Sequence, residues 1–161
     1  MTAEPQRPER LHRLGVLYIR NLIFFVTACT VRRKAILANE QTHKALIEFA
    51  QIGEKRGAFV GAYVLMPDHF HLFVWFNGSD LSLAIWVKSL KNRLSKDLRE
   101  RGVATPHCQK RIFDHVLRSG ESYTEKWNYV CENPVRAGLV QTAESWPYAG
   151  EIFPLEFLSD R

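Results

Sequence analysis

Residues Val64–Phe76 have the sequence VLMPDHFHLFVWF, and this stretch determines how the rest of the chain can fold. Its Met66-Pro67-Asp68 segment separates two apolar stretches, as a turn does. On both sides of the turn the composition is apolar, β-branched and aromatic, which is typical of strands. Because a connection this short joins antiparallel strands, we predict a hairpin of strands at Ala58–Leu65 and His69–Phe76.

Two histidines occupy one face of the second predicted strand. Side chains two residues apart on a strand point to the same face, so His69 and His71 project side by side, roughly 7 Å apart at their bases. Two neutral imidazoles on a rigid backbone suit a divalent cation that keeps open positions for a substrate. The alternative is a pair of ordinary packed or solvated histidines, and the pair alone does not decide between the two.

The segments before and after the hairpin predict further elements of an α+β domain. Leu22–Thr30 is typical of a central strand. Asn39 can cap a helix that runs to about Arg56 and stops at Gly57. A second helix, capped by Ser79 or Asp80, is predicted to run to about Arg101. Its predicted buried stripe consists of Leu83, Val87, Leu90, Leu94 and Leu98.

The second half of the chain completes the predicted topology. We expect a loop at Gly102–Lys110, a strand or extended segment at Arg111–Leu117, and a helix at Glu121–Asn133 that Pro134 stops. The order β-α-β-β-α, followed by a short β segment and a helix, predicts a ferredoxin-like antiparallel sheet with helices packed on it. The histidine pair would then lie on a central strand.

Length and composition are those of one ordinary globular domain. The chain has 161 residues, of which 46% are hydrophobic and 24% charged, enough for a hydrophobic core. We expect a poorly ordered polar N-terminus at residues 1–15, one domain at residues 16–150 and a C-terminal tail at residues 151–161. The apolar run Val16–Cys29 is interrupted by Arg20-Asn21, so we interpret it as buried strand and expect no signal peptide or membrane span.

Cysteine usage and charge limit the environment and the partners. Cys29, Cys108 and Cys131 are odd in number and show no CxxC spacing, which favours a reducing cytoplasm over a disulfide frame or a structural zinc site. A net charge of +5 permits a polyanionic partner without requiring one. The charged face of the second predicted helix, with Lys88 and Lys91, is either solvated surface or a track for phosphates.

The last predicted helix carries a second candidate group. At 100° per residue, Trp127 and Val130 share an apolar side, whereas Tyr129 lies roughly opposite Trp127 and Asn133 returns to the side of Tyr129. A tyrosine hydroxyl can act as a nucleophile when a metal ion or a base activates it. Two histidines and one amide oxygen would leave room on Mg²⁺ or Mn²⁺ for water and phosphate oxygens. A surface tyrosine beside an amide remains the alternative.

Together these segments resemble the REP-associated tyrosine transposases, an IS200-like transposase family within the HUH single-strand transposase superfamily. The combination of the histidine pair with the motif that begins at Tyr129 is highly specific. The resemblance extends from about Leu22 to Tyr148. The matching stretches are Phe25-Val26-Thr27, Met66-Pro67-Asp68-His69-Phe70-His71, Phe113-Asp114-His115 with Leu117-Arg118, and Tyr129 through Val140.

The resemblance implies a metal-dependent endonuclease and strand transferase that acts on single-stranded DNA near hairpins of repetitive extragenic palindromes, as in DNA transposition and recombination. His69 and His71 would hold Mg²⁺ or Mn²⁺. Tyr129 would form a 5′-phosphotyrosine link and leave a free 3′-OH. Asn133 would be the third ligand, although related insertion-sequence transposases usually have the longer Gln there, and Glu132 could replace it if the helix end were rotated.

The resemblance also implies partners and a location. Single-stranded DNA with hairpins would be the substrate, in the bacterial cytoplasm at the nucleoid and not at a membrane, and the protein would be a monomer or a helix-swapped homodimer. Large aromatic residues of the hairpin and of the second predicted helix are expected in the core instead of stacked on bases. The expected phosphate contacts are Arg111, Arg118 and Arg136, which flank the site segments, with Lys88 and Lys91.

Two other functions fit parts of the pattern. One is a non-catalytic module or regulator that binds a DNA hairpin on the same fold. The other is a small metal-dependent phosphoesterase that uses the histidine pair without a covalent step. The cyclic phosphodiesterases with two His-x-Thr/Ser motifs are excluded, because the sequence contains no such motif.

Overall fold

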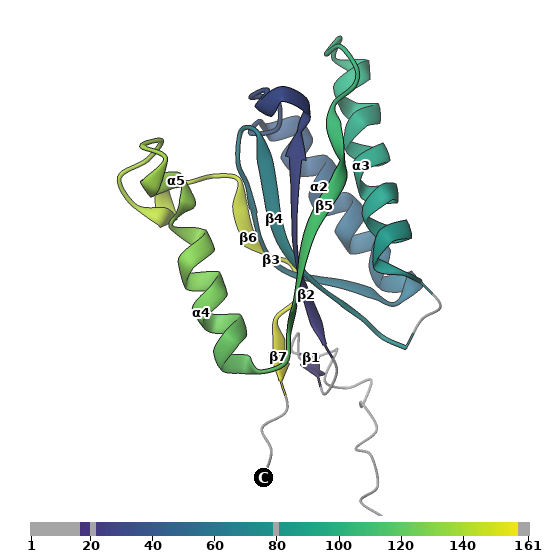
Figure 1. Cartoon of the computed structure of the whole chain (residues 1–161), viewed down its shortest axis with the longest axis vertical. Coiled ribbons are helices and arrows are strands. Elements are labelled where there is room, and N and C mark those ends of the chain that lie inside the picture. The colour runs from purple at the N-terminus through teal and green to yellow at the C-terminus, as the bar shows by residue number, and fades with distance from the viewer. Residues whose placement is uncertain (1–16, 20–21, 79–80, 158–161) are drawn as a thin grey trace, which may run out of the picture.

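A sheet of five antiparallel strands runs through the centre of the protein, with helices on both of its faces (Figure 1). The computed structural model describes residues 17–19, 22–78 and 81–157. The strand order is β5-β2-β4-β3-β6, the predicted ferredoxin-like arrangement with one added edge strand. The strands are β1 (Leu17–Ile19), β2 (Ile23–Thr30), β3 (Ala58–Leu65), β4 (His69–Phe76), β5 (Cys108–Leu117), β6 (Ala149–Glu151) and β7 (Leu155–Phe157).

The hairpin predicted from the sequence is present, with the predicted bounds for β3 and β4. The Met66 N–H donates to the carbonyl of His69 across the turn, at 2.8 Å. β4 lies between β2 and β3 in the sheet. The histidine pair is therefore on a central strand, and the alternation of side chains directs His69 and His71 to the face opposite Phe70.

Helix α2 (Glu40–Gly53) forms as its local sequence predicts. The side chain of Asn39 accepts a hydrogen bond from the Thr42 N–H at 2.9 Å, which satisfies one of the free amides of the first turn. The 3-10 turn η2 (Glu54–Arg56) continues α2, and Gly57 ends it in the left-handed conformation.

Helix α3 (Leu83–Glu100) packs beside α2 on the same face of the sheet (Figure 1). Its cap differs from the prediction: the hydroxyl of Ser82 accepts the N–H of the third helical residue, whereas Ser79 and Asp80 lie outside the described residues. Leu83 is only partly buried. The buried side chains of α3 are Trp86, Val87, Leu90, Leu94 and Leu98.

Helix α4 (Gly120–Cys131) covers part of the opposite face of the sheet (Figure 1). The prediction of one helix at Glu121–Asn133, stopped by Pro134, is wrong in detail. A short helix, α5 (Asn133–Arg136), follows α4, and Pro134 lies in its first turn, where a residue without an N–H leaves no bond unmade. No helix in the described part of the chain is both long and apolar enough to cross a membrane.

Strand β5 is longer than predicted. It includes Cys108–Lys110, which we expected in the loop Gly102–Lys110. The pairing of β5 with β2 shifts register between Ala28 and Thr30, and this irregularity accommodates extra residues of β5. β5 is an edge strand of the sheet and pairs only with β2. Most of its side chains are exposed or only partly buried.

The C-terminal segment is also more structured than predicted. Of the tail expected at 151–161, the described part contributes to β6 and forms β7, which pairs in parallel with β1. Leu155 is buried against Gly61, where a β-carbon would lie only 2.8 Å from the Leu155 side chain and 2.7 Å from the Tyr123 hydroxyl. The N-terminus expected to be poorly ordered, residues 1–15, lies outside the described residues.

Candidate functional site

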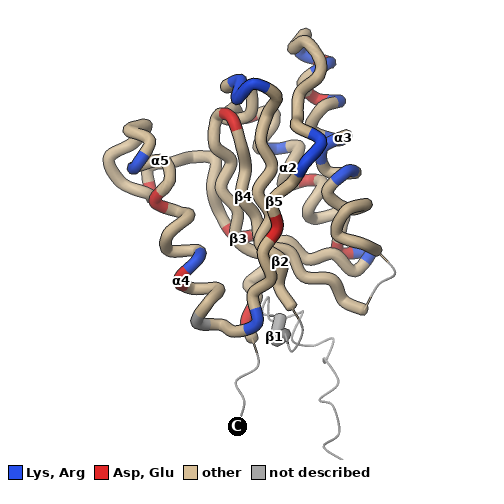
Figure 2. The backbone as a smooth tube through the Cα atoms, in the orientation of Figure 1, with Lys and Arg blue, Asp and Glu red and all other residues tan. Residues whose placement is uncertain are grey.

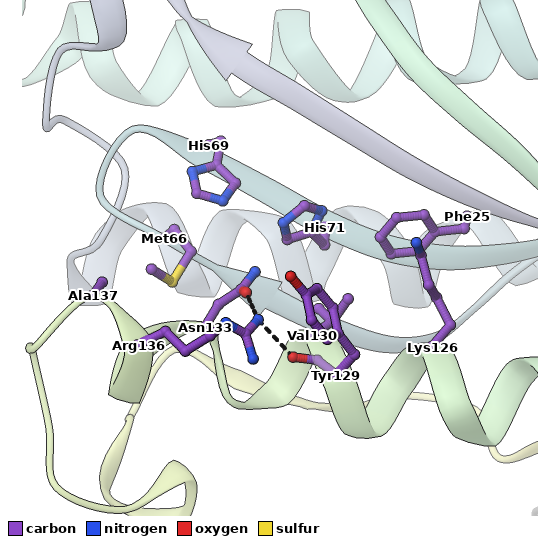
Figure 3. A pocket seen from close by; sticks show the side chains of 10 residues that line it. All are labelled: Phe25, Met66, His69, His71, Lys126, Tyr129, Val130, Asn133, Arg136 and Ala137. Atoms are coloured by element: carbon purple, nitrogen blue, oxygen red, sulfur yellow. Dashed lines mark hydrogen bonds between the residues drawn. The ribbon is translucent and has the colours of Figure 1, made fainter.

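A pocket of about 450 Å³ lies between the hairpin and α4–α5 (Figure 3). It brings together four of the predicted site residues, His69, His71, Tyr129 and Asn133, although more than a third of the chain length separates the first pair from the second in sequence. The residues that line the pocket are Phe25, Met66, His69, His71, Lys126, Tyr129, Val130, Asn133, Arg136 and Ala137.

Strand β2 orients His71. Thr27 is directly opposite His71 in the sheet, and its Oγ1 lies 2.7 Å from His71 Nδ1. The Phe25 ring stacks on the imidazole at a centroid distance of 5.3 Å and an angle of 15°. When Nδ1 carries the proton and donates it to Thr27, Nε2 has a free lone pair for a ligand.

The surroundings of His71 keep it neutral. Burial, followed by the positive charges of His69, Lys126, Arg33 and Arg136, lowers the pKa of His71 to about 3. The neutral imidazole is the form that binds metal ions. His71 is therefore ready to act as a ligand at any pH near neutrality.

The turn residue Asp68 orients His69 in a comparable way. Asp68 Oδ1 lies 2.7 Å from His69 Nδ1, and Arg33 Nε donates to Asp68 Oδ2 at 2.9 Å. Burial alone would raise the pKa of Asp68, but the hydrogen bond and charge of His69, together with Arg33, hold that pKa below its usual value. A carboxylate on the outer ring nitrogen is the usual support of a metal-binding histidine.

The loop that supplies Arg33 has an unusual backbone. Arg32 and Arg33, in the 3-10 turn η1 (Val31–Arg33), have φ angles of 56° and 54°. Left-handed conformations cost free energy for residues with a β-carbon and often occur at functional sites. Here the conformation directs Arg33 towards Asp68 and towards Cys29, whose Sγ lies 2.8 Å from Arg33 Nη1.

Tyr129 faces the histidines from α4. Its side chain points from the helix toward His71 (Figure 3), and it is 62% exposed. The Arg136 guanidinium lies 4.0 Å from the centroid of the Tyr129 ring, and its Nη2 donates to the Tyr129 carbonyl at 2.7 Å and to Asn133 Oδ1. Arg136 thus holds both the phenol ring and the amide at the rim of the pocket.

The donor set of the pocket fits a divalent cation with open coordination positions. The described residues contain no group of three or more His, Cys, Asp or Glu side chains placed to hold a metal ion, so the site is unlike a closed structural zinc centre. Two imidazoles are available, and Asn133 Oδ1 lies beside them but already accepts a bond from Arg136. Glu132, the predicted substitute, does not line the pocket.

The predicted phosphate contacts are separated in space. Arg136 lines the pocket, whereas Arg111 and Arg118 are exposed and do not line it. Lys88 and Lys91 line another pocket, of about 610 Å³, between α3 and the start of β5. Basic residues are spread over several elements of the protein (Figure 2).

Lys91 is held by the backbone of β5. Its Nζ donates to the carbonyl oxygens of Gln109, at 2.7 Å, and Lys110, at 3.3 Å. Burial lowers the pKa of Lys91. These contacts tie α3 to β5, which is a structural role that the sequence pattern did not indicate.

Lys126 is a pocket residue that the sequence analysis missed. Its Nζ lies 4.9 Å from the centroid of the Phe25 ring, at the opposite end of the pocket from Arg136 (Figure 3). Among the described residues no carboxylate forms an ion pair with it. Its position three residues before Tyr129, on the same side of a helix, is the signal that could have identified it.

Comparisons with known proteins agree with this geometry. The family model described as "Transposase IS200 like" matches residues 18–118. A REP-associated tyrosine transposase of Escherichia coli (strain K12) is 22% identical over 152 residues, which cover 89% of this chain and 88% of that protein. A provisionally named REP-associated tyrosine transposase of Haemophilus influenzae is 27% identical over 114 residues, but the match covers only 58% of this chain and 62% of that protein.

A solved structure shares the fold. It is a REP-associated tyrosine transposase bound to a REP hairpin, with a TM-score of 0.60 and 22% sequence identity, and the match covers 92% of this chain and 82% of that one. The residues that the family model matches include β2, the hairpin and β5. Tyr129 and Asn133 lie beyond them, so their assignment depends on the motif and on the pocket.

Proposed function

Because the chain belongs to the IS200-like transposase family, a family of enzymes, we propose that it cuts and rejoins single-stranded DNA through a covalent link to Tyr129. The observation that carries this proposal is the single pocket in which Tyr129 faces His69 and His71. Packing of a surface helix does not require a phenol to point at a histidine pair. A nucleophile that attacks a metal-bound phosphate, in contrast, must lie close to the metal ligands.

The chemistry conserves phosphodiester bonds. The Tyr129 oxygen attacks the scissile phosphorus and loses its proton to solvent, a P–O bond to tyrosine forms, and the bond from phosphorus to the 3′-oxygen breaks. The 3′-oxygen takes up a proton, and the 5′ end stays attached to the protein. Attack by a 3′-OH reverses the exchange, so the strand can be resealed without ATP. One bond replaces another at each step.

The side chains around Tyr129 have separate roles in this proposal. His69 and His71 would hold Mg²⁺ or Mn²⁺, and the ion would supply charge stabilisation at the scissile phosphate. Thr27 and Asp68 would fix the orientation of the two imidazoles. Arg136 would hold the phenol ring in place and could contact the phosphate directly.

We propose single-stranded DNA beside a hairpin as the substrate. The similar structure was solved with a REP hairpin, and unpaired DNA has a backbone that can be drawn into a narrow site. Tyr129 lies in one pocket with the histidine pair of its own chain, and we propose that the site works in a monomer without exchange of α4 between two copies. A protein with this activity would act on the nucleoid in the cytoplasm.

The experiment that tests the proposal is a search for a covalent adduct. Hairpin-containing single strands from the host genome are incubated with the wild type in Mn²⁺ or Mg²⁺ and in EDTA, and the products are separated on a denaturing gel. We expect a protein–DNA adduct that requires the metal and is lost in Tyr129→Phe. Tyr148→Phe changes a tyrosine outside the pocket and should behave as the wild type.

The other outcomes identify the alternative functions. Binding of the hairpin strands without an adduct or cleavage would indicate a non-catalytic binding module. Cleavage that survives Tyr129→Phe would indicate a metal-dependent phosphoesterase in which no covalent step occurs.

A further inference from the structure

The site pocket continues across the open part of the sheet towards β5. A second pocket, of about 430 Å³, lies between β5 and α4, and it shares Lys126 and Tyr129 with the site pocket. Its β5 wall is formed by His115 and Leu117. A strand of DNA held at the histidines can therefore leave the site over the surface of β5.

Phe113 lies beside this path, on the same strand as His115 and Leu117 but outside the lining of both pockets. It is opposite Thr27 in the sheet, and Thr27 is opposite His71, so the three residues form one row across β5, β2 and β4. With neighbouring strands spaced 4.7–4.9 Å, the backbone of Phe113 is roughly 10 Å from that of His71. Residues directly opposite each other share a face, so Phe113 lies on the face that carries the histidines.

The Phe113 side chain is exposed to solvent and lies next to the site. It is 64% exposed. A single exposed apolar side chain is ordinary on a protein surface, but this one lies in the same row as a candidate metal ligand. The large aromatic residues that we considered for stacking, Phe73, Trp75 and Trp86, are all buried in the core.

Charged side chains of both signs border this path, and Glu125 lines the second pocket next to Lys126. Lys126 borders both pockets from α4, and Arg111, two residues before Phe113, is exposed. Asp114 is opposite Val26, whose side chain lies in the core under α2 and α3, so the Asp114 side chain is directed to the other face of the sheet. An exposed ring with cations beside it is the arrangement by which proteins hold unpaired bases and their phosphates.

We propose that Phe113 is a stacking platform for an unpaired base of the DNA strand next to the scissile phosphate, with Lys126 contacting the phosphate backbone between the platform and Tyr129. This proposal rests on the proposed function and specifies where the strand runs. The edge of β5 could instead pair with a second copy of the chain, and the test below separates the two.

The test measures binding in EDTA, so that it does not depend on cleavage. The probes are a fluorescent oligothymidine of about twelve nucleotides and a sugar-phosphate strand of equal length without bases. The variants are Phe113→Ala, Phe113→Trp and Lys126→Gln. The matched control is Ile52→Ala, which truncates a side chain on α2 that is 63% exposed.

We expect Phe113→Ala to weaken oligothymidine binding by about fivefold to a hundredfold, the range for loss of one stacked base. Phe113→Trp and Ile52→Ala should bind as the wild type does. On the strand without bases, Phe113→Ala should have no effect, whereas Lys126→Gln should weaken binding of both probes.

The proposal is overturned if Phe113→Ala binds oligothymidine as tightly as the wild type does. It is overturned as well if the substitution weakens binding of the strand without bases as much as binding of oligothymidine. It is also overturned if Phe113→Ala leaves binding unchanged but alters the sedimentation coefficient, since Phe113 would then belong to an interface between copies. Absence of a Tyr129 adduct would contradict the proposed function and leave this measurement intact.

Discussion

The Oγ1 of Thr27 lies 2.7 Å from Nδ1 of His71, so that strand β2 decides which ring nitrogen of the candidate metal ligand is free. The contact joins residues 44 positions apart through the pairing of β2 with β4. It means that the sheet itself, and not a flexible loop, sets the orientation of the ligand.

Thr27→Val removes this hydrogen bond and keeps the shape of the side chain. We expect the affinity for Mn²⁺ to fall by roughly 10- to 100-fold, the usual effect of losing an outer partner of a ligand histidine. Isothermal titration calorimetry or Mn²⁺ electron paramagnetic resonance measures the change. Thr124→Val, at an exposed position of α4, is the control, and an equal loss in both variants would contradict the role of Thr27.

Arg136 competes for the oxygen of Asn133, because its Nη2 donates to Asn133 Oδ1. If Asn133 is a metal ligand, Arg136→Met should raise Mn²⁺ affinity severalfold by freeing the amide oxygen and removing a positive charge. The gain in Mn²⁺ affinity from Arg136→Met should be smaller in an Asn133→Ala background, because only the removal of the positive charge then contributes. A gain that is the same in both backgrounds would show that Asn133 does not bind the metal.

The pKa of His71 predicts how stability depends on pH. Burial, followed by the neighbouring positive charges, lowers this pKa to about 3 in the folded protein, whereas the unfolded chain takes up the proton near pH 6.5. The unfolded state therefore binds more protons between these values. The contribution of His71 to stability is fully present above about pH 6.5 and is lost as the pH falls towards 3.

Urea unfolding in EDTA at pH 7.5 and pH 4.5 measures this effect. The wild type should lose more free energy of unfolding on acidification than His71→Gln, by on the order of 2 kcal/mol. Equal losses in the two proteins would mean that His71 is protonated in the fold at pH 4.5.

Lys126 should act through charge. We expect Lys126→Gln to make the dependence of log Kd on log salt concentration shallower by about 0.7, the value for one phosphate contact on a single strand. The measurement is oligothymidine binding over a series of salt concentrations. Lys44→Gln, which removes an equal charge from an exposed site on α2, should leave the slope unchanged, and a parallel change in both would indicate only an effect of net charge.

Local patterns predicted the centre of the fold. The bounds of β3 and β4, the Asn39 cap and the Gly57 stop all follow from residues within a few positions of one another, and the structure has each of them. The start of β5 and the packing of Leu155 over Gly61 were missed. Both depend on contacts between segments far apart in the chain, which no local periodicity indicates.

In the site, too, local patterns identified some residues, whereas others depend on contacts between distant segments. Alternation along one strand placed His69 and His71 on a common face, and the spacing of one motif placed Tyr129 near Asn133. Register between strands was needed to place Thr27 and Phe113 beside His71, because the matching stretches that contain them do not indicate what either side chain contacts. Arg111 and Arg118 were chosen as sequence neighbours of the site, and neither Arg111, in β5, nor Arg118, directly after it, lines the pocket.

The most direct test of the account is to identify the residue that carries DNA after reaction with a hairpin-containing single strand in Mn²⁺. The adduct is digested with nuclease and protease, and the nucleotide-bearing peptide is sequenced by mass spectrometry. We predict a 5′-nucleotide on Tyr129 alone. A nucleotide on another tyrosine, such as Tyr123, whose pKa burial raises to about 12, or cleaved DNA with no modified peptide, would contradict it.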